Sequence, residues 1–293
     1  PQGVRRDAAT PATWEELAAR GYPLRGAETM SLQGDAWFHP GRFQESRNSQ
    51  LGATIHVWSV TDSTNARAHA AAVDAAQRGS VWVTEEQTAG RGRQGRSWLA
   101  ERFSSLLFSV WLPVSLRESA APQLLPLALG LAVCEALRHS TGADVQVRWP
   151  NDLMLEDHKI GGMILEARGS GTPQTIVGVG LNVSTSVSYL QQVGLQQAAS
   201  LPAASRSVGR EALLAAILVQ MERRMQDWQA DRLEDLLTAW RQHDSLRGRR
   251  VRAQTERRTF DGRVLGVDAD GLLELRLQSG EVQRFTAAEV HIL

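Results

Sequence analysis

The chain has 293 residues, enough for two or three domains, and its 42% hydrophobic and 22% charged residues are typical of a folded globular protein. Basic and acidic residues both number 32, and this zero formal charge disfavours broad electrostatic binding to nucleic acid or membranes. The single cysteine, Cys134, excludes an internal disulfide framework and a cysteine-based zinc site. Its apolar, helix-like surroundings predict a buried thiol.

The sequence carries no sign of a membrane segment or a secretion signal. It has no run of about 18 apolar residues. Its first residues do not combine a charged stretch with a hydrophobic core. We therefore expect neither a transmembrane helix nor a signal peptide, and we take the cytoplasm as the default location.

The first 50 residues differ in composition from the rest of the chain. They are rich in Pro, Gly and Arg and contain one predicted helix, at residues 10–21, with Thr13 as its cap. From about residue 54 to residue 245, predicted strands and helices are interspersed, which indicates an α+β domain. The predicted strands are 53–60, 80–86, 105–112, 145–149, 152–156, 159–168 and 174–183. The predicted helices are 66–79, 121–142, 208–229 and 231–244.

The pattern changes again at Leu246. Five short strands follow, separated by Asp-Gly and Ser-Gly turns. Fewer than 50 residues of this kind predict a small closed or nearly closed barrel. The predicted domains are therefore 1–50, 51–245 and 246–293.

Residues 90–95 read GRGRQG and formally match the dinucleotide fingerprint G-x-G-x-x-G. A Rossmann glycine loop opens a helix, whereas a strand-like segment follows here, which disfavours a nicotinamide-dependent oxidoreductase. Glycines let backbone N–H groups approach an anion, and Arg91, Arg93 and Arg96 supply positive charge. The alternative is a surface turn with solvated arginines.

Two polar turns are further candidates for a binding site. Residues 61–65, TDSTN, either cap the next helix or use hydroxyl and amide groups to bind a polar neutral ligand. Asn151 and Asp152 are ordinary turn residues, or Asp152 helps to hold a metal–phosphate group. None of the seven histidines forms a pair spaced for a metal, and Ser63 lacks the context of a hydrolase nucleophile.

Lys159 is the only lysine in a chain with 32 basic residues; all the others are arginine. An ammonium group is a compact point charge that fits between two oxygens, whereas a guanidinium group is a planar fork. Gly161 and Gly162 beside it allow a ligand or a backbone segment to approach closely. The alternative is a solvated turn lysine.

The order of these motifs resembles the bacterial biotin–protein ligases, over about residues 54–293. The motifs are STN at 63–65, QTAGRGRQG at 87–95, RWPND at 148–152, KIGG at 159–162 and GVGLN at 178–182. The resemblance implies a mixed-sheet biotin/lipoate-ligase catalytic domain flanked by helices, followed by a C-terminal SH3-like barrel. Enzymes of this family join biotin to ATP, forming biotinyl-5′-AMP and pyrophosphate, and then pass biotin to a lysine of a carboxylase carrier domain.

The resemblance also assigns roles to residues of this chain. The residues expected to bind biotin are Ser63, Thr64, Asn65, Gln87, Arg91, Gly92, Arg93 and Lys159. The residues expected at the nucleotide are Arg93, Trp98, Asn151, Asp152 and Asn182, with Lys159 and Arg93 as the catalytic pair. Mg²⁺ is expected to enter with ATP, near Asp152, without a protein cage. Gln94 stands where family members often carry another basic residue.

The resemblance further implies a biotin carboxyl carrier protein or domain as partner and is compatible with a homodimer. Two alternatives stay open: a lipoate- or octanoate-transferring ligase of the same fold, and a biotin-responsive DNA-binding repressor. The GRGRQG loop and the C-terminal barrel favour biotin over lipoate. Residues 3–26 resemble the last helix and wing of a winged helix-turn-helix domain, and we expect a degenerate or truncated remnant that does not bind DNA.

Overall fold

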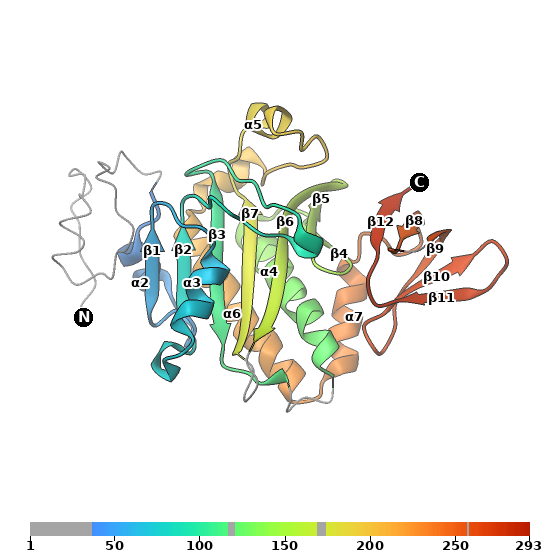
Figure 1. Cartoon of the computed structure of the whole chain (residues 1–293), viewed down its shortest axis with the longest axis horizontal. Coiled ribbons are helices and arrows are strands. Elements are labelled where there is room, and N and C mark those ends of the chain that lie inside the picture. Colours follow the sequence, from blue (N-terminus) through green and yellow to red (C-terminus); the bar gives the residue numbers. More distant parts are fainter. Residues whose placement is uncertain (1–36, 117–120, 169–173, 257) are drawn as a thin grey trace.

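The computed structural model describes residues 37–293, apart from 117–120, 169–173, 257 and the side chain of 206 (Figure 1). The helix predicted at 10–21 therefore lies outside the described residues. A seven-stranded mixed sheet forms the centre of the molecule, in the order β1-β2-β3-β7-β6-β5-β4. Only β1 and β2 pair in parallel. The strands are β1 (Ile55–Trp58), β2 (Val81–Thr84), β3 (Ser105–Leu112), β4 (Gln146–Arg148), β5 (Asp152–Leu155), β6 (His158–Arg168) and β7 (Gln174–Asn182).

Helices cover the two faces of this sheet unequally. The short helix α3 lies on one face, against β2, β3 and β7, and α4, α6 and α7 pack together on the other (Figure 1). Among the described residues, two further short helices, α2 and α5, and several 3₁₀ turns belong to the domain. The helices are α2 (Pro40–Ser46), α3 (Thr64–Ala71), α4 (Leu125–Thr141), α5 (Val187–Gln192), α6 (Arg210–Gln229) and α7 (Leu233–His243). The 3₁₀ turns are η2 (Ala75–Gln77), η3 (Arg93–Gly95), η5 (Pro122–Leu124) and η6 (Ala203–Ser207).

Successive side chains of β3 point to opposite faces of the sheet. Leu106, Phe108 and Val110 join the main core beneath α4 and α6. Trp111 instead belongs to a smaller tryptophan-rich cluster on the α3 face. Ser109, two residues before Trp111 on the strand, is directed to the same α3 face, where its hydroxyl contacts Thr64 and Asn65.

The apolar segment after β3 forms the long helix α4, and its sequence explains where this helix begins and ends. Eleven of its seventeen residues are buried, and Pro126 stands in the first turn, where a missing N–H costs nothing. Gly142 ends the helix with φ +69°, a left-handed conformation that glycine adopts without strain, and its N–H donates to Arg138 O. No helix within the described ranges is both long and apolar enough to cross a membrane.

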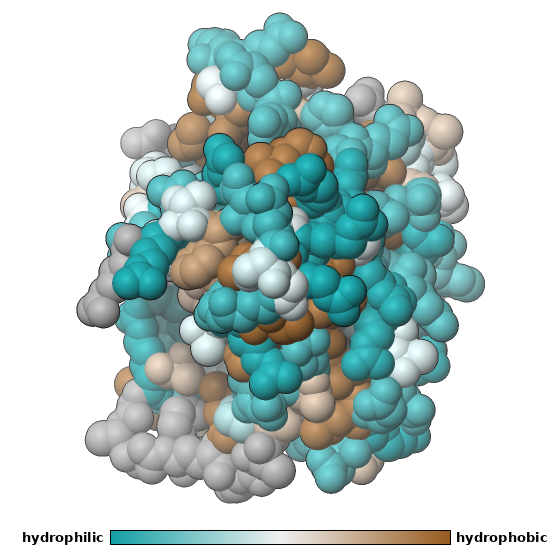
Figure 2. Space-filling model, turned by 90° about the vertical axis from the view of Figure 1, so that its right-hand side faces the viewer, coloured by the Kyte–Doolittle hydropathy of each residue, from teal (hydrophilic) through white to brown (hydrophobic). Residues whose placement is uncertain are grey.

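The C-terminal residues form a separate five-stranded antiparallel sheet in the order β11-β10-β9-β8-β12. Phe260 of β9 and Phe285 of β11 make an edge-on ring contact across the intervening strand, with 5.3 Å between centroids, so the sheet curls. Arg250 and Arg252 point outward from β8, and this side of the molecule is mainly hydrophilic (Figure 2). The strands are β8 (Arg250–Gln254), β9 (Thr259–Val267), β10 (Leu273–Leu277), β11 (Val282–Phe285) and β12 (Glu289–Ile292).

Residues 37–50 pack with the central sheet and its helices. Phe38 and Phe43 are fully buried, and α2 contacts α6. The backbone N–H of Phe38 donates to Glu85 Oε1 over 2.7 Å, and Glu85 is itself held by Arg210 of α6. We therefore propose that residues 37–50 belong to the central domain, which the sequence predicts to begin at residue 51.

The buried carboxyl group of Asp244 lies between α7 and the C-terminal sheet. Its Oδ1 accepts the N–H of Leu246 over 2.9 Å, whereas Oδ2 has no hydrogen-bond partner among the described residues. Burial raises the pKa of Asp244 to about 6. The folded chain therefore binds this proton more tightly than the unfolded chain does, and the carboxyl group destabilises the fold once it ionises.

We predict that Asp244→Asn stabilises the protein more at about pH 8 than at about pH 4. The raised pKa makes the wild type lose stability as pH rises from 3.8 to about 6, and asparagine abolishes that loss. The difference between the two pH values should be on the order of 2 kcal/mol in the free energy of urea unfolding. Asp270→Asn, at an exposed turn, controls for the loss of one negative charge. An Asp244→Asn effect of equal size at both pH values would contradict the assignment.

Candidate active site

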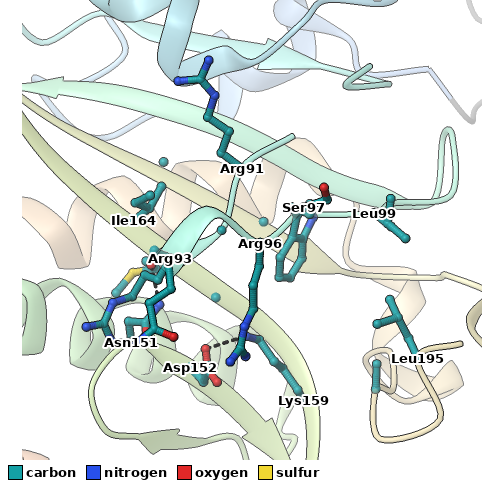
Figure 3. A pocket seen from close by; sticks show the side chains of 18 of the residues that line it. Arg91, Arg93, Arg96, Ser97, Leu99, Asn151, Asp152, Lys159, Ile164 and Leu195 are labelled. Atoms are coloured by element: carbon teal, nitrogen blue, oxygen red, sulfur yellow. Dashed lines mark hydrogen bonds and ion pairs between the residues drawn. The ribbon is translucent and has the colours of Figure 1, made fainter. Parts of the chain in front are cut away.

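A cavity of about 570 Å³ opens on the α3 face of the central sheet (Figure 3). Every residue that the sequence predicts for the site lines it. These residues are Ser63, Thr64, Asn65, Gln87, Arg91, Gly92, Arg93, Trp98, Asn151, Asp152, Lys159 and Asn182. Segments more than 100 residues apart in the chain thus meet around one space, and what each residue binds remains a prediction.

Three glycines on β6 and β7 form the floor of this cavity. Gly162 pairs with Gly180 across the two strands, and Gly178 is two residues before Gly180 on the same face. A Cβ atom at Gly178 would lie 2.1 Å from Asn65 Oδ1, and one at Gly180 would lie 2.4 Å from Trp98 Cε2. The floor is therefore bare because functional side chains rest on it.

The two glycines after Lys159 face opposite sides of the sheet. A Cβ atom at Gly162 would lie 3.3 Å from Lys159 Nζ, on the cavity side. A Cβ atom at Gly161 would instead meet Gly180 O at 3.0 Å and the core side chain of Leu153. Gly162 therefore makes room at the site, and Gly161 makes room for backbone and core packing.

At one end of the cavity, neutral polar groups converge at the start of α3. Ser63 occupies the N-cap position, but its side chain makes no capping bond, so helix capping does not account for this hydroxyl. Gln87 Oε1 accepts the backbone N–H of Thr64 over 2.9 Å. The Ser109 hydroxyl lies 2.7 Å from Thr64 Oγ1 and donates to Asn65 Oδ1 over 2.5 Å. Side chains from α3, β3 and the segment after β2 thus form one hydrogen-bonded group.

At the other end, Lys159 and Arg93 lie around the carboxylate of Asp152. Lys159 Nζ lies 2.6 Å from Asp152 Oδ1 and 5.7 Å from the centre of the Trp98 ring. Arg93 donates to Asn151 Oδ1 over 3.1 Å, and Asn151 is held in turn by Met163 O (Figure 3). Burial lowers the pKa of Arg93, and the nearby Asp152 charge opposes this effect. The lysine side chain is 38% exposed, so a ligand in the cavity can reach it.

The glycine-arginine loop folds as a tight hairpin over the cavity. Gly92 N donates to Arg96 O over 2.7 Å, and Trp98 N donates to Gly90 O over 3.0 Å. Arg91 points away from Lys159 and Asp152, whereas Arg93 and Arg96 point to that end of the cavity (Figure 3). Arg96 also pairs with Glu289 of β12, which connects the loop to the C-terminal sheet. The loop is therefore a wall of the site, and Arg93 and Arg96 are held by protein partners and are not simply solvated.

The nucleotide candidates include an acceptor without a partner. Asn182 is 4% exposed, and its Nδ2 donates to Ala199 O over 3.0 Å. Its Oδ1 is buried and has no hydrogen-bond partner among the described residues, so it could accept a donor from a ligand. No cluster of three or more His, Cys, Asp or Glu side chains placed for a metal ion occurs among these residues.

Several residues that line the cavity were not predicted from the sequence. Arg148 reaches the charged end, where burial lowers its pKa and Asp152 opposes that shift. Residues 194–198 also line the cavity, and the end of this segment pairs with β6, where Lys159 N donates to Gln197 O over 2.9 Å. Residues 288–291 of the C-terminal sheet close one side. Arg148 was visible inside the RWPND motif, whereas the other two segments carry no local signal.

We predict that Gly178→Ala lowers the free energy of unfolding by about 1–3 kcal/mol, measured by chemical denaturation. Asn65 cannot retreat from the added methyl group without breaking its bonds to Ser109 and Glu166. Gly92→Ala is the control, because its nearest neighbour would lie 3.5 Å away, and it should change stability by less than about 0.5 kcal/mol. Equal stability of the two variants would show that Asn65 does not need this glycine.

Two family models match this chain, one in the central domain and one over the C-terminal sheet. The biotin/lipoate A/B protein ligase family matches residues 57–182, and the biotin protein ligase C terminal domain matches residues 247–293. The biotin protein ligase of Aquifex aeolicus, solved with biotin and ATP, shares the fold. It superposes with a TM-score of 0.67 at 23% identity, over 82% of this chain and 99% of that one.

Curated relatives extend the similarity over most of the sequence. The bifunctional ligase/repressor BirA of Bacillus spizizenii is 28% identical, over 96% of this chain and 89% of its own length. The biotin--[acetyl-CoA-carboxylase] ligase of Paracoccus denitrificans is 32% identical, over 78% of this chain and 97% of its own length. Because both family models and nearly the whole of a relative at this identity are matched, the chain belongs to the biotin protein ligases of the biotin/lipoate A/B protein ligase family.

Proposed function

We propose that this protein activates biotin with ATP to biotinyl-5′-AMP and then transfers biotin to a lysine of a biotin carboxyl carrier domain. The observation that carries the proposal is one cavity with a neutral polar end and a cationic end. Biotin has the matching form, with a neutral ureido head at one end and a carboxylate at the other. Relatives of this chain are named biotin--[acetyl-CoA-carboxylase] ligases, which supports the same substrate and carrier.

The neutral end suits the ureido head. Thr64, Gln87 and Asn65 offer a hydroxyl and two amides there, with Ser63 and Arg91 beside them. Ile164, opposite Gly178 on the floor, gives an apolar surface for the aliphatic chain. The biotin carboxylate then lies toward Lys159 and Arg93.

The charged end suits the nucleotide. Trp98 offers an aromatic face, Asn182 Oδ1 an acceptor, and Asn151 and Arg93 further polar contacts. Mg²⁺ would enter bound to the phosphates of ATP, as that ion usually does, and Asp152 supplies the protein carboxylate nearest the lysine. Lys159 would then exchange its bond to Asp152 for the oxygens of the ligands.

The chemistry needs positive charge more than it needs a protein nucleophile. A carboxylate oxygen of biotin attacks the α-phosphorus of ATP; the new O–P bond forms as the bond to the β-phosphate oxygen breaks, and pyrophosphate leaves. The two anions repel each other, and charge grows on the phosphoryl oxygens, so Lys159 and Arg93 lower the barrier in a partly desolvated site. The carrier's lysine amine next attacks the acyl carbon, and AMP leaves.

Two other functions compete with this proposal. A lipoate- or octanoate-transferring ligase would share the catalytic fold, but the C-terminal match at residues 247–293 is to biotin protein ligases. Repression of transcription would require residues 1–36, which lie outside the described part of the chain. The absence of DNA binding, a homodimer and a cytoplasmic location all stay predictions.

We predict that the protein catalyses biotin-dependent ATP–pyrophosphate exchange, and that Lys159→Ala lowers its kcat about 10²–10³-fold. Lys159→Arg should also lose at least about tenfold, because a planar guanidinium cannot replace a point charge between oxygens. Arg284→Ala, which removes an exposed cation on the C-terminal sheet, should leave the exchange rate unchanged.

The exchange assay tests the proposed function and the role of Lys159 separately. A wild-type protein without biotin-dependent exchange would refute the proposed function. Full activity of Lys159→Arg in an active wild-type background would refute only the role given to Lys159.

A further inference from the structure

Glu166 lies directly behind the neutral end of the cavity, on β6. It stands opposite Ile176 of β7, on the same face of the sheet as the floor glycines. Its Oε2 accepts from Asn65 Nδ2 over 2.8 Å and lies 3.2 Å from His69 Nε2. Its Oε1 accepts from Arg168 over 3.0 Å. The side chain is only 19% exposed and does not line the cavity itself.

The carboxylate of Glu166 decides which way the Asn65 amide faces. An ionised carboxylate can only accept hydrogen bonds, so Asn65 must turn its NH₂ group toward Glu166. The Asn65 oxygen is then directed to Ser109 and to the floor at Gly178. Asn65 is 5% exposed, so it has little freedom to choose another orientation. Its Oδ1 is therefore fixed as an acceptor that takes one bond from Ser109 and keeps a second lone pair for a donor of the ligand.

The amide of Gln87 is held by its oxygen, whereas that of Asn65 is held through its NH₂ group. Its Oε1 accepts from the backbone N–H of Thr64, which can only donate. Nε2 is consequently the donor end, and it lies near Gly90 at the base of the loop. The neutral end thus presents an N–H group from Gln87 and a C=O group from Asn65.

The protonation state of Glu166 agrees with this arrangement. Burial raises the pKa of this carboxyl group, but the hydrogen bonds from Asn65 and Arg168 and the charge of Arg168 outweigh burial, and the net pKa is lowered. Burial also lowers the pKa of His69, which favours the neutral imidazole. The acceptor that orients Asn65 is thus ionised at neutral pH.

We propose that Glu166 is a positioning residue that, through Asn65, fixes an acceptor at the neutral end and so selects a ligand head with an N–H group, such as a cyclic urea. A cyclic urea carries both N–H donors and a C=O acceptor, which match Asn65 Oδ1 and Gln87 Nε2. A dithiolane head, as in lipoate, carries neither, so Gln87 Nε2 and the second lone pair of Asn65 Oδ1 would gain no bond from it. This inference rests on the proposed function and names the groups that make the site specific for biotin.

The test is a double-mutant cycle in the exchange assay with two substrates. One substrate is biotin; the other is its cyclic carbamate analogue, in which oxygen replaces one urea N–H. We expect Glu166→Leu to raise the KM for biotin about tenfold, to leave kcat and the KM for ATP nearly unchanged, and to weaken the preference for biotin over the carbamate. In an Asn65→Ala background, Glu166→Leu should add no further increase in KM, because Glu166 acts through Asn65.

Arg168→Leu is the matched control. It removes the partner of Glu166 Oε1 but leaves the bond to Asn65, and it should change the KM for biotin by no more than about twofold. A purely structural role for the Glu166 cluster would instead lower kcat and raise both KM values together. It would also leave the preference between biotin and the carbamate unchanged.

Glu166→Gln carries the test if Glu166→Leu does not fold. Glutamine keeps the shape but can turn either its oxygen or its NH₂ toward Asn65, so the KM for biotin should rise about threefold. Wild-type KM and wild-type preference in Glu166→Gln, or additive effects in the Asn65→Ala background, would overturn the proposal. An inactive wild type would overturn the proposed function instead.

Discussion

The pairing of β6 with β7 is the constraint on which the rest of the site depends. Its register places Gly162, Gly178 and Gly180 on one face of adjacent strands. A side chain at either position of β7 would collide with Asn65 or Trp98. The bare floor therefore fixes how closely α3 and the glycine-arginine loop can approach the sheet. It also fixes the space that remains for a ligand between a neutral end and a charged end.

The charged end depends on a balance between few carboxylates and many cations. Asp152 is the partner of Lys159, and its charge opposes the lowering of the pKa of Arg93 and Arg148 by burial; at Arg148 the charge of Asp157 acts in the same direction. An excess of positive charge in a partly buried space is costly without an anion. Anionic ligands, a carboxylate and a triphosphate, would relieve that cost on binding. The ion pair between Arg96 and Glu289 extends the same electrostatics to the C-terminal sheet.

The sequence predicted most of the sheet and the motif residues, because both have local signatures. The apolar run 105–112 coincides with β3, and five short C-terminal strands were expected. The helix predicted at 66–79 was too long: Ala-rich composition favours helix throughout, but α3 ends at Ala71, and the chain then turns back toward β2. Ser109 and Glu166 were missed because their importance depends on strand register, which places isolated polar residues of apolar strands beside Asn65. The pairing of residues 197–199 with Lys159 of β6 likewise depends on tertiary contacts alone.

The most direct measurement is the intact mass of purified carrier domains after incubation with this protein, ATP, Mg²⁺ and an equimolar mixture of biotin and lipoate. A biotin carboxyl carrier domain and a lipoyl domain should both be present, so that either product can form. We expect the mass of the biotin carboxyl carrier domain to rise by one biotinyl group, at its acceptor lysine, and only when ATP is present. Lipoylation without biotinylation, or no modification of either domain, would contradict the assignment of the cavity to biotin.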